Sequence, residues 1–202
     1  MRITTARFAL VAAAALALSA HAEPPGWRAV DALQLDVAGV KLGMGYDQAL
    51  SALGDHFKLS TAEREQLKAS TSIAYGEITK KDQPTSVRFT KDGNTVVVSF
   101  VERVPSDQTE KVRVSKVSLS IPSSKGNADS MRQSARDKYG EPSDPRRKSL
   151  LVWCAHYNQI AQCDPAKPKL SLAMTSLSLS DPTAEKAVNA YLQNSKATKP
   201  AL

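Results

Sequence analysis

The sequence predicts an α+β fold, in which an antiparallel β-sheet is covered on one face by helices. Three observations carry this prediction. Residues 46–54 and 128–140 have apolar side chains at helical spacing and end at a glycine. Several other segments alternate apolar and polar residues, as strands with one buried face do. Two of these segments are joined by Asp92-Gly93, a dipeptide typical of a two-residue β-hairpin turn.

The first 22 residues have the pattern of a secretory signal peptide. Arg2 and Arg7 form a basic start, an apolar run from Phe8 to Ala20 follows, and Ala20-His21-Ala22 is a small-x-small cleavage site. The run is too short to span a bilayer comfortably. We therefore expect cleavage after Ala22, export to a bacterial periplasm, and a mature chain with no transmembrane segment and no lipid-anchoring cysteine at its start.

Residues 23–194 are expected to form one α+β domain rather than two closely packed halves, and residues 195–202 a flexible tail. Without Arg2 and Arg7, 25 basic residues stand against 20 acidic ones in the 180-residue mature chain, a net charge of +5. This excess favours anionic partners, namely an acidic envelope protein, lipid head groups or polyanionic glycans. Scattered lysines that serve only solubility are the alternative.

The sequence predicts that the chain is organised around Val40–Gly54, because an extended entry there leads into a well-marked helix. Asp47 suits the positive first turn of that helix. Gly54 is expected to end it in a left-handed C-terminal cap. The predicted buried side is formed by Leu50, Leu53 and Phe57.

Short strands and a second helix are expected around this first helix. Leu33 to Val37 alternates as a short strand before it. Ser60 and Glu63 have the spacing of a capping box, which starts a second helix that runs to about Ala69. The following strands are expected at Ser72 to Lys80, around Val87 and Phe89, and through Val96, Val98 and Phe100.

In the C-terminal half, the alternation changes phase between Ser115 and Lys116, which indicates either a β-bulge or a bend. Asn127 is the predicted N-cap of the helix that ends at Gly140, and the likeness of the two helix-and-stop units suggests an internal duplication. Further strands are expected at Ser149 to Tyr157, with Leu151, Trp153 and Ala155 on one face, and from Leu170 to Leu179 with a phase shift. Asp181-Pro182 starts a final helix.

Cys154 and Cys163, the only cysteines, are predicted to form a structural disulfide, because an even pair in an exported chain favours one. A redox-active pair has the tighter Cys-x-x-Cys spacing. A zinc site would need two more ligands, of which His156 supplies only one.

Arg146, Arg147 and Lys148 form the one dense basic cluster and are the predicted anion contact. The cluster has no aromatic neighbour, whereas single-stranded nucleic-acid sites interleave basic and stacking residues. The sequence therefore argues against a nucleic-acid partner.

No group of residues has a spacing that requires catalysis, a metal or a cofactor. The mature chain has two histidines, His56 and His156, and no nucleophile elbow. Gly43-Met44-Gly45 lacks the lysine of a phosphate-binding loop. The paired carboxylates lie in polar segments and are interpreted as solvated: Glu63 with Glu65, and Asp107 with Glu110.

Three motifs resemble those of small exported bacterial domains. They are Val40-Lys41-Leu42-Gly43-Met44, the helix from Asp47 to Leu53-Gly54, and Lys138-Tyr139-Gly140-Glu141-Pro142 before the strand with Trp153. They are similar to the outer-membrane assembly lipoproteins with the β-lactamase-inhibitor-like fold. The resemblance implies a helical pair before an antiparallel sheet, and action by binding proteins rather than by catalysis. It transfers no functional residues.

The function expected from these observations is non-catalytic binding in the bacterial envelope. The alternatives are a hydrolase that acts on envelope material and an inhibitor or immunity protein against an exported enzyme. An enzyme would show a polar cleft that contains a histidine or carboxylate with a shifted pKa, whereas a binding protein would show an exposed apolar patch.

The disulfide assignment predicts that Cys154 and Cys163 of the exported protein resist alkylation until reductant is added, as mass spectrometry would measure. Reduction should lower the melting temperature while the fold persists, because closing this short loop contributes roughly 2–3 kcal/mol. Labelling of both cysteines in the native, unreduced protein would contradict the assignment.

Overall fold

The computed structural model describes residues 26–106, 109–144, 147, 149–158, 160 and 162–197. Its helices are the 3₁₀ turn η1 (Ala32–Gln34), α1 (Tyr46–His56), α2 (Thr61–Ala69), α3 (Lys125–Tyr139) and α4 (Pro182–Ala197). Its strands are β1 (Asp36–Val37), β2 (Val40–Lys41), β3 (Thr71–Tyr75), β4 (Asp82–Lys91), β5 (Asn94–Glu102), β6 (Val112–Ser120), β7 (Leu150–Cys154), β8 (Lys169–Ala173) and β9 (Ser176–Ser180). The predicted signal peptide, residues 1–22, lies outside the described residues.

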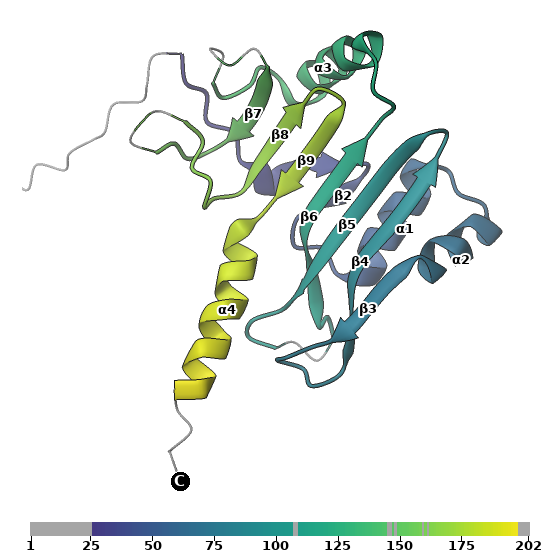
Figure 1. The fold of residues 1–202 in the computed structure, drawn as a ribbon, viewed down its shortest axis with the longest axis vertical. Helices are drawn as coiled ribbons and strands as arrows, with labels where there is room; N and C mark the ends of the chain where they lie inside the picture. The colour runs from purple at the N-terminus through teal and green to yellow at the C-terminus, as the bar shows by residue number, and fades with distance from the viewer. Residues whose placement is uncertain are drawn as a thin grey trace, which may run out of the picture.

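The fold is α+β, as predicted. Seven strands form one antiparallel sheet in the order β3-β4-β5-β6-β9-β8-β7, and β1 and β2 form a separate hairpin. Figure 1 shows α1 behind the sheet with α2 beside it, and α3 at the upper end of β7–β9, so the face toward the viewer carries none of these three helices. Helix α4 continues from β9 and projects beyond the sheet (Figure 1). It extends to Ala197, three residues into the predicted tail.

The large sheet consists of two meanders that meet at β6 and β9. The helical pair α1–α2 precedes the meander β3–β6, and α3 precedes the meander β7–β9. Since β6 and β9 are antiparallel and Ser118 lies opposite Ser178, a half turn about that pair places β4, β5 and β6 on β7, β8 and β9, and β3 has no counterpart. Under this half turn, the position of Phe89 in β4 corresponds to the position of Trp153 in β7.

Aromatic contacts between helices and the sheet follow the same half-turn relation. Phe57, which caps α1, packs on Phe89 with ring centroids 5.6 Å apart. Tyr139, the last residue of α3, packs on Trp153 at 5.8 Å. In each half, an aromatic residue at the end of a helix therefore packs on an aromatic residue of the strand that the half turn relates.

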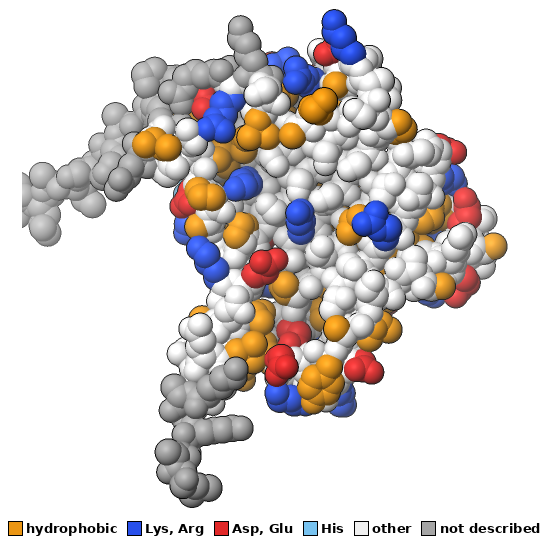
Figure 2. Space-filling model, in the orientation of Figure 1, with side chains coloured by type: hydrophobic (Ala, Val, Ile, Leu, Met, Phe, Trp, Pro, Cys, Tyr) orange, Lys and Arg blue, Asp and Glu red, His pale blue; other side chains and the backbone are white. Residues whose placement is uncertain are grey.

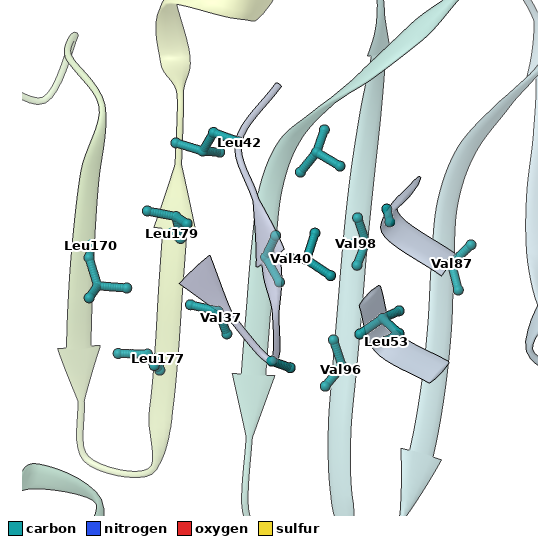
Figure 3. Close-up of a cluster of buried hydrophobic side chains, with 14 of the residues drawn as sticks. Val37, Val40, Leu42, Leu53, Val87, Val96, Val98, Leu170, Leu177 and Leu179 are labelled. Atoms are coloured by element: carbon teal, nitrogen blue, oxygen red, sulfur yellow. The ribbon is translucent and has the colours of Figure 1, made fainter. Parts of the chain in front are cut away.

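The β1–β2 hairpin fills the centre of the covered face. Val37 and Val40 are 0% exposed and lie over the sheet among side chains of β5, β6, β8 and β9 (Figure 3). The Oδ1 atom of Asp36 lies 2.7 Å from the Lys138 ammonium, and the Tyr139 hydroxyl donates to the Asp36 carbonyl at 2.7 Å. The β1–β2 hairpin thus packs on strands of both meanders and is also bound to α3.

Three local predictions are confirmed. Asp92 and Gly93 both have positive φ, 52° and 77°, as a two-residue hairpin turn requires. Ser115 is an extra residue in β6, because Ser99 pairs with Lys116 and Phe100 with Val114. This β-bulge, rather than a bend, keeps both halves of β6 on the core face. Ser60 and Glu63 form the predicted capping box of α2.

Helix α1 does not end at Gly54, which corrects the sequence prediction. It continues to His56, and Lys58 takes the left-handed conformation with φ 50°. Gly54 is buried, and a Cβ atom there would lie 2.2 Å from the Arg64 guanidinium. The glycine therefore allows α2 to pack closely against α1.

Other boundaries also differ from the predictions. Residues 32–34 form a 3₁₀ turn where a strand was expected, and β3 ends at Tyr75. The Ser124 hydroxyl, not Asn127, caps α3 by accepting the Asn127 N–H. The phase shift after Leu172 is a tight turn between β8 and β9, with Met174 at φ 51°, and β7 ends before Ala155. The turn contains no glycine, asparagine or aspartate that would have marked it.

We predict that Leu53→Ala destabilises the protein by about 2–5 kcal/mol, because Leu53 is 1% exposed and its removal leaves a cavity. Ser51→Ala, on the exposed side of the same helix, should change stability by less than about 0.5 kcal/mol. Urea unfolding measures both. Equal effects would contradict the assigned packing face.

The Asp36 carboxylate should make the stability of the protein depend on pH in the acid range. Burial opposes ionisation, but the Lys138 ammonium and the Gly39 N–H outweigh it and hold the pKa of Asp36 below its usual 3.8. The carboxylate therefore stabilises the fold above that pH, and its contribution is lost as pH falls through the lower folded-state pKa. The melting-temperature gap between the parent and Asp36→Asn should narrow from pH 6 to pH 3. A gap that stays constant would contradict this.

Candidate functional site

The uncovered face of the large sheet, which we call the open face, is the candidate functional site. Its side chains alternate with those of the core and point away from the helices. Strand pairing aligns them in three rows across β4, β5, β6, β9, β8 and β7. The rows are Thr90, Thr95, Ser120, Ser176, Ala173, Leu150; then Arg88, Val97, Ser118, Ser178, Ser171, Val152; then Ser86, Ser99, Lys116, Ser180, Lys169, Cys154.

Hydroxyl groups dominate these rows. Ten of the eighteen side chains are serine or threonine, and some pair across strands, such as Thr90 with Thr95 at 3.0 Å and Ser120 with Ser176 at 3.3 Å. The charged members are Arg88, Lys116 and Lys169, and no carboxylate occurs in these rows. Figure 2 shows this face as mostly uncharged, with separate basic side chains over the strands and acidic ones at its margins.

A pocket of about 170 Å³ lies where the rows reach β7, and we call it the disulfide pocket. Leu150 and Val152 form its apolar floor, and Cys163 contributes a wall. Arg147 and Lys169 also line it. Hydrophobic side chains gather at this end of the face in Figure 2. The open face thus ends in an apolar hollow with two cations around it.

Cys154 and Cys163 form the predicted disulfide, with an S–S distance of 2.04 Å. Cys154 ends β7, and its backbone N–H donates to the Ser143 hydroxyl at 2.9 Å. Val30 N–H donates to the Cys154 carbonyl at 2.9 Å. The cross-link therefore fixes the wall of the pocket to a strand edge that neighbouring segments already hold.

Only one member of the predicted anion contact can be placed. The Nε atom of Arg147 lies 3.7 Å from Oδ2 of Asp144, whose side chain is 5% exposed. Arg146 and Lys148 lie outside the described residues. Arg147 is therefore half-buried and paired at the pocket, rather than part of a fully solvated loop.

The residues considered for catalysis do not meet. His56 packs edge-on against Phe57 near the covered face, whereas His156 is exposed beyond β7, where its carbonyl accepts the Asp164 N–H. Within the described part of the chain, no three His, Cys, Asp or Glu side chains are grouped as metal ligands.

The carboxylates with displaced pKa values act as structural anchors. A hydrogen bond from Lys91 lowers the pKa of Glu63 to about 2, with help from its capping contacts to Ser60. Burial opposes ionisation of Glu102, but the N–H groups of Ile78 and Thr79 and the Thr79 hydroxyl lower its pKa overall. Each contact joins a helix or turn to the sheet.

Two exposed apolar side chains lie at the free edge of the sheet. Ile73 and Tyr75 of β3 are 64% and 58% exposed, and β3 has β4 as its one neighbour in the sheet. The opposite edge differs, because Ser143 N–H donates to the Val152 carbonyl of β7 at 2.8 Å. An exposed apolar patch is the feature expected of a binding protein.

Sequence reasoning missed the rows on the open face. The signal was present in Ser176-Leu177-Ser178-Leu179-Ser180, where serines alternate with the leucines and therefore occupy the other face of the strand. The leucines indicated the strand, and the serines indicated the chemistry of its outer face. Lys116 and Lys169 could not be placed together, because they are far apart in sequence and become neighbours only through β9.

Comparisons of the chain with protein-family models, with curated proteins and with solved structures find no match. None of the described helices has the length and apolar character needed to cross a membrane.

Proposed function

We propose that this protein is an exported, non-catalytic binding protein of the bacterial envelope that holds an anionic ligand on its open face. One observation carries the proposal: three rows of hydroxyls with Arg88, Lys116 and Lys169 among them, and no carboxylate in the rows. Hydroxyls donate and accept hydrogen bonds, and the cations favour a negatively charged partner.

Export is supported by the disulfide, because such bonds persist in oxidising compartments. The pattern of residues 1–22 supports the same location. The motifs that resemble outer-membrane assembly lipoproteins also favour binding over catalysis.

We predict that Lys116→Gln with Lys169→Gln weakens retention on isolated envelope membranes or peptidoglycan by a factor of about 2 to 30. Exposed ion pairs contribute roughly 0.2–1 kcal/mol each, and higher salt should mimic the substitutions. Sedimentation with each fraction measures retention, and circular dichroism checks that the variant is folded.

The matched control is Lys41→Gln with Lys125→Gln, which removes the same charge from exposed positions outside the open face. It should bind as the parent does. Equal losses in both double variants would contradict a site on the open face, and absence of retention on every envelope fraction would contradict the proposed function.

A further inference from the structure

We propose that the disulfide pocket is a terminal subsite of the open face, which takes the free carboxyl end of an acidic peptide whose last side chain is apolar. This inference rests on the proposed function and names its ligand class. Three features of the pocket and its surroundings carry it: an apolar floor, a pair of cations, and the continuation of the pocket into the hydroxyl rows.

The floor and the size suit one apolar side chain. Val152 is 7% exposed and lies beside Leu150, both on the open face of β7. The volume is about 170 Å³. A cavity of about 150 Å³ lined by apolar groups holds benzene, so a leucine- or valine-sized group fits here.

The cations suit a carboxylate. The Nε atom of Arg147 lies 3.7 Å from Oδ2 of Asp144, an ion-pair distance, and both residues line the pocket. A guanidinium has five N–H donors, and its remaining donors can bind a second carboxylate in bidentate geometry. Lys169 contributes a second positive charge, so the cations exceed the single Asp144 carboxylate in the lining.

The rows continue this site across the sheet. Lys169 and Lys116 both lie opposite Ser180, on its two sides, so their backbones are about 9–10 Å apart, which is two strand spacings. An extended peptide covers that distance in about three residues. A ligand with its carboxyl end near Lys169 would therefore place an acidic side chain, three positions before the end, near Lys116.

The same surface favours a peptide over a glycan. Aromatic side chains offer a sugar ring a flat apolar surface for stacking, and no aromatic residue occurs in the three rows. A peptide backbone instead offers alternating donors and acceptors, which serine hydroxyls can match.

The test uses the full exported chain and a fluorescent hexapeptide with leucine at its free carboxyl end and glutamate three positions earlier. The matched ligand is the same peptide with a carboxyl-terminal amide. Fluorescence anisotropy should show at least about tenfold weaker binding of the amide, since a charge-assisted contact is lost. Equal affinity of acid and amide would overturn the inference.

Lys169→Gln should weaken binding of the acid peptide and leave binding of the amide peptide nearly unchanged. The difference between the two affinities should therefore shrink, as in a double-mutant cycle. Ser171→Leu, which fills the pocket without changing its charge, should weaken binding of both peptides. Lys41→Gln, at an exposed position outside the open face, should leave the affinities of both peptides and the difference between them intact. Equal weakening of acid and amide by Lys169→Gln would also overturn the inference.

The two proposals can fail separately. If the protein is retained on envelope fractions through the open face but does not distinguish acid from amide, the terminal subsite is wrong and the proposed function stands. The same holds if an anionic glycan binds and the peptide does not. Failure of both peptide binding and envelope retention overturns both proposals.

Discussion

The structure depends on burying one face of a seven-stranded sheet beneath helices that are too few to cover its centre. The β1–β2 hairpin fills that space, where Val37 and Val40 are completely buried. Apolar burial contributes roughly 25 cal/mol per Å², so an open gap at the centre would be costly. The Asp36 contacts to Lys138 and Tyr139 then fix the hairpin to α3, which belongs to the second meander.

This one-sided core explains why the other face is polar. Each strand of the two meanders must place apolar residues toward the helices, and alternation gives every second position to solvent. Serine and threonine occupy most of those positions in the described rows, with Arg88, Lys116 and Lys169 among them. The half-turn relation centred on Ser118 and Ser178 brings the last strands of both meanders to the middle of the sheet. The result is one continuous surface, to which β7 adds the disulfide pocket.

Much of the fold could be predicted because its signals are local. The Asp92-Gly93 turn, the Ser60 capping box and the bulge at Ser115 each depend on residues close in sequence. The errors arose where tertiary contacts determine the position of a helix end, a turn or a side chain. Gly54 looked like a helix stop, but it makes room for Arg64 of the next helix. The β8–β9 turn has no typical turn residue, and the site joins lysines on β6 and β8 that only the register of β9 brings together.

If the open face carries function, nuclear magnetic resonance should detect an anionic ligand there. On titration with a short polyglutamate, the amide signals of Ser118, Ser178 and Lys169 should shift in a saturable and salt-sensitive way. The amide signals of Met131 and Ala135, which line a groove on the helix-covered face, should stay unchanged. Shifts confined to that groove, with the open face unperturbed, would contradict a functional role for the open face.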